Sequence, residues 1–487
     1  MRFAFLAVLF SAGSLCAQEQ QWRQLRDGGQ VAFVNGDFAV AEQQWVAAYN
    51  EARTLGVKTE AFTESQRNLA ALYSMMWRFD EAGAMLRDAG AMMKAAGREP
   101  SEDWQMLLTA GRLELAESDF TQASPDLASA LRMISANFGE DHPQTAEAYL
   151  CLGTLEREQE MLNDAAENLH KAAGILSESS GAPSAAAAHA RAEWSRLLVA
   201  QARYVDAVDQ ARRAVDLARK ADPPSGRVTY DKGKTYFRSQ LGRIALGDSL
   251  LALGEAYAAQ GRLDDASIAL EQALATNAEV FGEKHLPDVP CLAALAEVSL
   301  RLGNSARASQ LAMSAESICK QYATPEWLPM ARVFLIAAKL SKRPEETETL
   351  FREAADIATK RAGAHSLLMA EILEARGDAR LSSDVDKAEN DYRQAMAYRQ
   401  SKLPESHPDI ARSLIDVARV YDQRREPDLA ESFYKRAIQT LESAVGNDSF
   451  ILIPPLQSYE TFLRLQKRSE EADGIEDRIS RLRRGRE

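Results

Sequence analysis

The sequence lacks the motifs on which common catalytic and metal sites are built. It has only six histidines and four cysteines in 487 residues, and no His-Glu-x-x-His, Cys-x-x-Cys or nucleophile-elbow pattern occurs. Gly233-Lys234-Thr235 resembles the end of a phosphate loop, but Val228 stands where that loop needs its first glycine. Carboxylates are abundant but scattered, and they indicate no acid–base pair. The sequence therefore predicts a non-enzyme with no cofactor and no metal.

Positive charge is in the minority. Lys and Arg number 58 against 71 Asp and Glu, which gives a net charge of -13. Because such a protein repels a phosphate backbone, we expect no nucleic-acid partner. Aromatic residues make up only 7% of the chain, and no stretch shows the alternation typical of a strand. The composition, dominated by alanine and leucine, predicts an all-α protein.

Long apolar runs are also missing, except at the N-terminus. Basic Arg2 precedes an apolar run from Phe3 to Phe10, and small residues follow as far as Ala17. This pattern predicts a bacterial-type signal peptide over residues 1–17 and export to the periplasm or the outside. The alternatives are an uncleaved anchor and a buried helix. No later stretch approaches the length of a membrane span, so we expect none after cleavage.

The stretch from Ser249 to Gly282 predicts a helix hairpin. Apolar residues recur at helical spacing in each half, and Gly261 lies between the halves, where it can take a left-handed cap. Asp264 and Asp265 then place negative charge at the start of the second helix. Small residues at Gly254 and Ala266 are expected where the two helices cross, because larger side chains would push the backbones apart.

This hairpin recurs along the whole chain. The alanine at its second-helix crossing is matched ten more times, mostly at steps of 39 to 42 residues with one step of 59. These positions are Ala41, Ala82, Ala123, Ala165, Ala207, Ala266, Ala308, Thr347, Ala388, Ala430 and Ala472. The last unit matches least, as expected of a capping repeat with one face in water. The sequence thus predicts eleven stacked hairpins.

The hairpin resembles a tetratricopeptide repeat. The residues that carry the resemblance are Leu253, Gly254, Tyr257, Gly261, Leu263, Ala266, Leu270 and Ala273. The period near 42 resembles the kinesin light chain class, as do the three linkers that contain His142-Pro143, His285-Leu286-Pro287 and His407-Pro408. The resemblance implies a right-handed superhelical α-solenoid of antiparallel helix pairs. We expect these histidines to cap or pack helix starts, and each repeat to contact only its neighbours.

The long step of 59 divides the array. Repeats one to five are predicted over residues 18–220 and repeats six to eleven over residues 244–487. Between them, residues 221–243 hold a Pro/Gly-containing break and five basic residues, Arg227, Lys232, Lys234, Arg238 and Arg243. This insertion is either a surface loop or a basic lip that contacts an acidic partner or lets the two blocks hinge.

Three cysteines remain after cleavage near Ala17. By the repeat register, Cys291 lies at the start of the first helix of repeat seven and Cys319 at the end of its second helix. Antiparallel packing brings these ends together, so a disulfide in an oxidising compartment is one alternative, worth roughly 3 kcal/mol in the chain-entropy model. The other is two buried thiols. Cys151 is expected in the core.

The resemblance also implies a concave groove, lined by the first helix of each pair, that takes an extended or helical peptide. The groove positions carried over by register are Arg67, Arg112, Arg157, Arg196, Arg332 and Arg419, interleaved with Glu147, Glu255 and Glu297. A row of guanidiniums suits the carboxylates of an acidic partner. Ordinary solvated arginines on helix faces are the alternative.

We therefore expect an exported, non-catalytic scaffold that binds a protein or peptide in the groove. The alternative from another class is an accessory or regulatory subunit, such as a sensor, of a cell-envelope enzyme or signalling complex. A third interpretation, an enzyme, would need two close, buried carboxylates in the groove. The sequence leaves self-association and the identity of the partner open.

Overall fold

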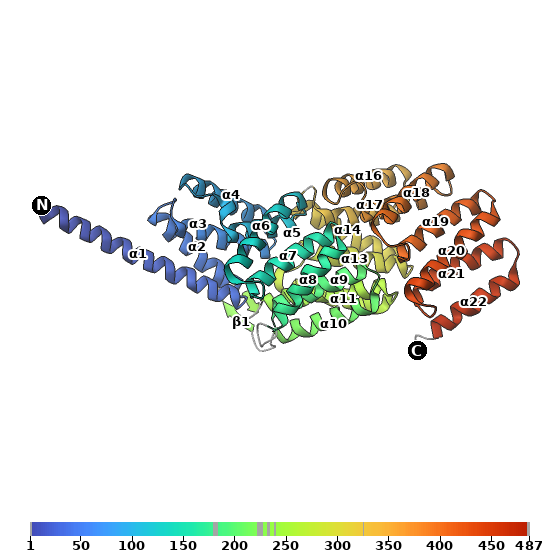
Figure 1. Cartoon of the computed structure of the whole chain (residues 1–487), viewed down its shortest axis with the longest axis horizontal. Helices are drawn as coiled ribbons and strands as arrows, with labels where there is room; N and C mark the ends of the chain where they lie inside the picture. Colours follow the sequence, from blue (N-terminus) through green and yellow to red (C-terminus); the bar gives the residue numbers. More distant parts are fainter. Residues whose placement is uncertain are drawn as a thin grey trace.

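The protein is a stack of helix hairpins. The computed structural model describes the backbone of residues 2–178, 184–221, 227–230, 234–237, 240–324 and 326–484, and the side chains of 16–177, 184–221, 241–324 and 326–484. Over the described residues, helices α1 to α22 pair in chain order into eleven hairpins (Figure 1). The all-α superhelical repeat fold is as predicted.

The first five hairpins contain α1 (Arg2–Val34), α2 (Phe38–Leu55), α3 (Glu60–Met75), α4 (Phe79–Ala95), α5 (Trp104–Ala116), α6 (Phe120–Phe138), α7 (Pro143–Glu158), α8 (Leu162–Glu178), α9 (Ala185–Ala200) and α10 (Tyr204–Ala221). The last six contain α11 (Gln240–Ala259), α12 (Leu263–Phe281), α13 (Asp288–Arg301), α14 (Ser305–Tyr322), α15 (Leu328–Leu340), α16 (Pro344–Arg361), α17 (Leu367–Arg380), α18 (Val385–Lys402), α19 (Pro408–Gln423), α20 (Pro427–Val445), α21 (Ile453–Leu465) and α22 (Ser469–Arg484). Short 3-10 helices cover Pro100–Glu102 and Phe450–Leu452.

The insertion between α10 and α11 contains two strands, which the sequence analysis missed. Strands β1 (Arg227–Tyr230) and β2 (Lys234–Phe237) pair antiparallel, with Arg227 opposite Phe237 and Tyr230 opposite Lys234. Val, Thr, Tyr and Phe favour a pleated backbone, but a run of four residues is too short to show a clear alternation. The break at Asp222–Gly226, together with Lys232 and Arg238, lies outside the described residues.

Two of the three linker histidines cap helices. The Nδ1 of His142 accepts from the backbone N–H of Gln144, and the Nδ1 of His407 accepts from that of Asp409, both at 3.2 Å. These bonds satisfy backbone donors that the first turn of a helix leaves without partners. His285 differs, because its own backbone N–H donates to the Asp288 carboxylate at 3.2 Å. The extra Leu286 separates His285 from Pro287, so His285 does not lie directly before α13, which begins at Asp288.

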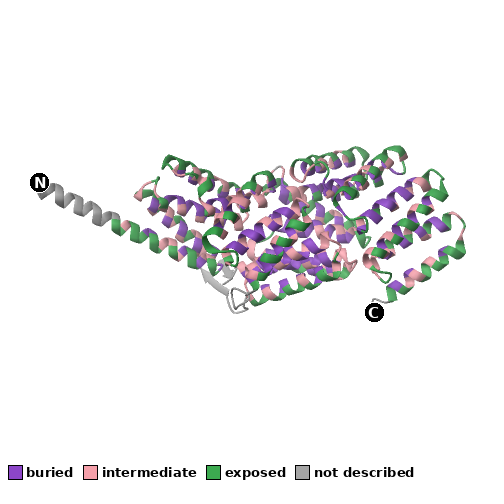
Figure 2. Ribbon diagram, in the orientation of Figure 1, coloured by how far each residue is buried: buried purple, intermediate pink, exposed green. Residues whose placement is uncertain are grey.

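The crossings within the hairpins follow the predicted register. Ten of the eleven second-helix positions are alanines with no exposed surface, and the remaining one, Thr347, is also buried. A Cβ added to Gly254 would lie 2.6 Å from Cγ of Leu270, so the helices approach too closely there for a side chain. Figure 2 shows the resulting buried stripe along the hairpins. The small residues therefore set the spacing within each repeat.

Replacing Gly254 with alanine is expected to destabilise the protein by about 1–3 kcal/mol, because Leu270 must shift to admit the methyl group. The control is Gly474→Ala in α22, where an added Cβ meets nothing within 4 Å. This second change should stabilise the protein by about 0.5–1 kcal/mol through helix propensity alone. Urea denaturation of both variants measures the difference. Equal effects from the two changes would contradict the tight crossing.

The superhelix also closes on itself, which corrects the expectation that only neighbouring repeats touch. The indole N–H of Trp327, just before α15, donates to the carbonyl of Ala116 at the end of α5, at 3.0 Å. The Nε2 of His407 lies 3.2 Å from the carbonyl of Ala200. The Glu160 carboxylate accepts from the backbone N–H of Leu367. These contacts span 207 to 211 residues, or five repeats.

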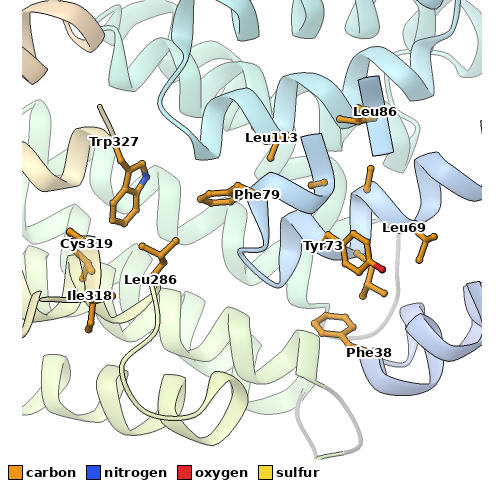
Figure 3. Packing of buried hydrophobic residues seen from close by; sticks show 14 of the residues in the cluster. Phe38, Leu69, Tyr73, Phe79, Leu86, Leu113, Leu286, Ile318, Cys319 and Trp327 are labelled. Atoms are coloured by element: carbon orange, nitrogen blue, oxygen red, sulfur yellow. The ribbon is translucent and has the colours of Figure 1, made fainter. Parts of the chain in front are cut away.

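We call this set of contacts the inter-turn seam. In it, the turn inside repeat three, four or five meets the start of the repeat five further along. Ser118 and Glu160 have positive φ values of 63° and 64°, where glycine would be less strained, yet each uses its side chain to bind the later repeat. Trp327 packs with Trp77 and Phe79 of repeat two and with Leu286 of repeat seven (Figure 3). The seam thus joins the two halves of the array.

The N-terminal helix α1 includes the predicted signal peptide. From residue 16 onwards, where side chains are described, Trp22 is the first buried one, and its indole N–H donates to Ser65 Oγ at 2.9 Å. Cys16 and Ala17 are exposed. None of the helices searched over the described residues is sufficiently long and apolar to cross a membrane.

Candidate functional site

The stacked hairpins surround a cavity of about 2340 Å³ that is partly open to solvent. Its wall is made mainly by the first helix of each repeat and by the linkers that precede these helices. The seam closes the cavity along one side, since Trp327, Leu328, Leu367 and His407 belong both to the seam and to the wall. The cavity lies where the resemblance placed a concave groove.

Four of the six predicted groove arginines line the cavity, and two do not. Arg112, Arg157, Arg196 and Arg332 line the cavity, as do Glu147, Glu255 and Glu297. Arg67 is buried outside the lining, where it binds Asp103 and Gln105 at the start of α5. Arg419 also lies outside the lining and binds Asp378 at 2.5 Å.

Each of these arginines is already paired with a carboxylate of an adjacent repeat. The contacts are Arg67–Asp103 at 2.9 Å, Arg112–Glu147 at 2.8 Å, Arg157–Glu193 at 2.9 Å, Arg196–Glu255 at 3.0 Å, Arg332–Glu371 at 3.4 Å and Arg419–Asp378 at 2.5 Å. The arginines therefore link the first helices of successive repeats, and four of them do so along the cavity wall. Sequence reasoning placed both signs of charge in the groove but did not pair them.

Arg196 is the centre of a largely buried charge network. Its guanidinium binds Glu193 at 2.5 Å, Asp248 at 2.6 Å and Glu255 at 3.0 Å, and Arg157 also binds Glu193. The position of Asp248 inside the wall, away from bulk water, would raise its pKa, but Arg196 outweighs this effect and lowers it. Two cations and three carboxylates thus hold α7, α9 and α11 together.

Three side chains of this network lie close enough together to hold a metal ion. Ligand atoms of His189, Glu193 and Asp248 lie within 4.8 Å of one another. However, both carboxylates bind Arg196, whose charge takes the role that a metal ion would have. Removal from bulk water lowers the pKa of His189, but Asp248, 2.7 Å away, more than compensates, so the pKa is raised. The trio is therefore best explained as part of the ion-pair network.

A second cluster of carboxylates lies on α17 and α19. Asp416 of α19 is buried next to Glu374 and Asp378 of α17, and Arg419 is 3.4 Å from its carboxylate. Burial and then the two neighbouring carboxylates raise the pKa of Asp416 well above its usual value. This buried group was not recognised from the sequence, because it does not lie at a groove position of the repeat.

The Asp416→Asn variant should gain stability relative to the wild type as pH rises from about 4 to 8. Because the folded-state pKa of Asp416 is raised, its stabilising contribution is complete below the unfolded pKa of about 3.9 and is lost as pH rises through the folded value. The change cannot exceed about 1.4 kcal/mol per pH unit. Urea denaturation across this range measures it. A difference that does not vary with pH would contradict the prediction.

The sequence left two alternatives for Cys291 and Cys319. Both are free, buried thiols, which is the second of these alternatives. Cys291 lines the cavity from α13, whereas Cys319 packs in the cluster around Trp327. Burial raises the pKa of Cys319 to about 12, so its thiol is unreactive at neutral pH. Cys151 is buried, as expected, and its sulfur accepts from Arg112 at 3.4 Å.

Comparison with known proteins identifies the repeats. The tetratricopeptide repeat family model matches residues 246–321 and 379–443, and the remaining hairpins share the same register. The repeats are therefore tetratricopeptide repeats, while assignment to the kinesin light chain class stays a prediction. No curated protein matches the chain.

Two solved structures have a similar fold. A Rap protein complexed with Competence and Sporulation Factor has a TM-score of 0.55 at 11% identity, over 89% of this chain and 99% of that chain. NprR in complex with its cognate peptide NprX has a TM-score of 0.51 at 15% identity, over 78% of this chain and 99% of that chain. At such identities the likeness shows a shared helical-repeat fold.

Proposed function

Because the chain is built from tetratricopeptide repeats, we propose that it is a non-catalytic scaffold that holds a peptide or a segment of a partner protein in its central cavity. The observation that carries this proposal is the cavity itself. Its volume of about 2340 Å³ exceeds the roughly 300–1,000 Å³ of a small-molecule pocket. An extended peptide fits a space of this size and shape.

The two similar structures support a ligand of this kind. The NprR structure is a complex with its cognate peptide, and the Rap structure is a complex with Competence and Sporulation Factor. Both share the superhelical fold that creates the cavity in this chain. The proposed site is therefore the cavity wall formed by α7, α9, α11, α13, α15 and α17.

We also propose that the protein is exported and acts in the cell envelope, either as a free scaffold or as a regulatory subunit of an enzyme or signalling complex. Cleavage near Ala17 would leave Trp22, the first buried side chain of the described part of α1, in place. Fractionation of the native cell, with sequencing of the mature N-terminus, tests this part. A cytosolic protein that keeps its first 17 residues would contradict it.

Blocking the cavity tests the binding proposal. Ala294 of α13 lines the cavity and is partly exposed, so Ala294→Trp should place a bulky ring in the lumen and weaken capture of a partner in a crosslinked pull-down. Ile268→Trp, at an exposed position of α12 outside the lining, is the matched control and should retain the partner. Circular dichroism confirms that both variants fold. Undiminished capture of the partner by Ala294→Trp would place binding elsewhere.

Charge reversal of the groove arginines is a poorer test. Arg112, Arg157 and Arg196 each bind a carboxylate of an adjacent repeat, so glutamate at these positions would set like charges against each other. Loss of a partner would then report damage to the array as well as damage to a site. The pairing also removes the reason to expect an acidic partner.

A further inference from the structure

Some charged side chains of the cavity wall are covered by their ion pairs, and others are exposed to the lumen. The side chains of Arg157 and Arg196 are only 16% and 13% exposed, because they are covered by their ion pairs. By contrast, four cavity-lining carboxylates have side chains that are 33% to 41% exposed. These residues are Glu158, Glu255, Glu297 and Glu371, from α7, α11, α13 and α17. The accessible lumen thus carries carboxylates from four repeats beside the cations Arg112, Arg332, Lys339 and Arg412, whose side chains are 33% to 58% exposed.

Arg332 reaches into this set of carboxylates. Its side chain is 58% exposed, and its contact with Glu371 is loose at 3.4 Å. Glu371, followed by Glu158, Glu255 and Glu297, raises the pKa of Arg332. Carboxylates from four different repeats therefore act on one exposed guanidinium. We call these four residues the carboxylate ring.

The residues that line the cavity carry a net negative charge. Its residues include eleven carboxylates and eight Lys or Arg side chains, so the balance is 8 minus 11, or -3, with His189 and His407 counted as neutral. A confined lumen with low-dielectric walls focuses such a charge. An anionic peptide would be repelled on entry, whereas a cationic one would be attracted.

We propose that the segment bound in the cavity is anchored by a cation, which takes the place of Arg332 in the carboxylate ring. The cation is a lysine or arginine side chain or a peptide N-terminal ammonium. This inference rests on the proposed function and adds the chemistry of its ligand. Charge-assisted hydrogen bonds to carboxylates from several repeats would give both affinity and position.

In this arrangement Arg332 competes with the cation of the ligand for the carboxylate ring. It neutralises part of the ring while the cavity is empty of ligand and moves aside when a stronger cation enters. Two substitutions should therefore have opposite effects on a cationic peptide. Removal of a ring carboxylate should weaken binding, and removal of Arg332 should strengthen it. Simple structural damage would weaken binding in both variants.

The test begins with a random heptapeptide display library selected against the full-length protein. Peptides captured by the wild type but not by Ala294→Trp are cavity ligands. They are expected to carry lysine or arginine, or to need a free N-terminus, and to be depleted in aspartate and glutamate. The best peptide, made synthetically with a fluorophore, is then titrated against three variants.

Glu371→Gln should weaken binding of this peptide about tenfold, and Arg332→Ala should tighten it by a similar factor, the change expected from one charge-assisted contact. The control Glu167→Gln, at an exposed residue of α8 outside the cavity, should change nothing. Cavity ligands that are acidic or uncharged, or a loss of affinity in Arg332→Ala, would overturn the cationic anchor and leave the scaffold proposal standing. Selection of peptides that bind Ala294→Trp equally well would instead overturn the scaffold proposal.

Discussion

Trp327→Ala should lower the free energy of unfolding by about 3–5 kcal/mol and loosen the superhelix. Trp327 is 2% exposed, its indole N–H donates to Ala116, and its ring packs edge-on against Trp77 at a centroid distance of 6.1 Å. Truncation removes this packing and leaves the Ala116 carbonyl without its indole donor. Urea denaturation measures the loss of stability, and small-angle X-ray scattering should show a larger radius of gyration.

Trp45→Ala is the matched control for this prediction. Trp45 is 1% exposed, and its indole N–H donates to the Arg26 carbonyl at 3.1 Å. Both partners belong to the first hairpin, so this variant should lose similar stability without any change in the overall dimensions of the folded protein. If Trp327→Ala kept the wild-type radius of gyration, or if both variants expanded equally, the seam would not be what holds the two turns together.

Arg196→Met is expected to destabilise the protein by about 3–5 kcal/mol at neutral pH, since it leaves Glu193 and Asp248 in the wall without their shared cation. The two carboxylates have side chains that are only 5% and 23% exposed. Methionine keeps most of the volume of arginine, so the loss reports charge more than packing. Denaturation with urea at pH 7 measures it.

The pH dependence gives this second prediction its own check. In the wild type the pKa values of Glu193 and Asp248 are lowered, so their stabilising contribution is present above the unfolded values near 4 and is lost as pH falls. The gap in unfolding free energy between Arg196→Met and the wild type should therefore narrow as pH falls below about 4. Arg203→Met, which breaks an exposed pair with Asp206, should behave like the wild type throughout. A gap that stays constant with pH would assign the loss to packing.

The sequence was sufficient for the local structure of the array. The residue at the crossing point of each second helix must be small, because the two helices of the hairpin meet there. Small residues therefore recur in the sequence at the period of the repeat. The same is true of the helix starts at His142 and His407, where an imidazole can satisfy a backbone donor. Such features depend on residues close together in the chain.

The cavity and its charge pairs could not be predicted in the same way. Which repeats meet across the superhelix depends on a small rotation added at every repeat, and no single residue records that rotation. The sequence therefore offers no reason to single out Trp327. Four of the six groove arginines line the cavity, but the carboxylates that bind these arginines lie about one repeat away, and nothing in the sequence indicates that they pair. The two strands were too short to be predicted from an alternation of apolar and polar residues.

The seam also governs the order in which the protein can assemble. The Ala116 carbonyl and the Trp327 indole are separated by 211 residues, so a nascent chain leaving the ribosome must present five further repeats before this bond can form. Until then Trp77 and Phe79 lack the later residues, Leu286 and Trp327, that share their core cluster. Half-made chains thus present an aromatic edge, which is a surface that chaperones recognise and that promotes aggregation.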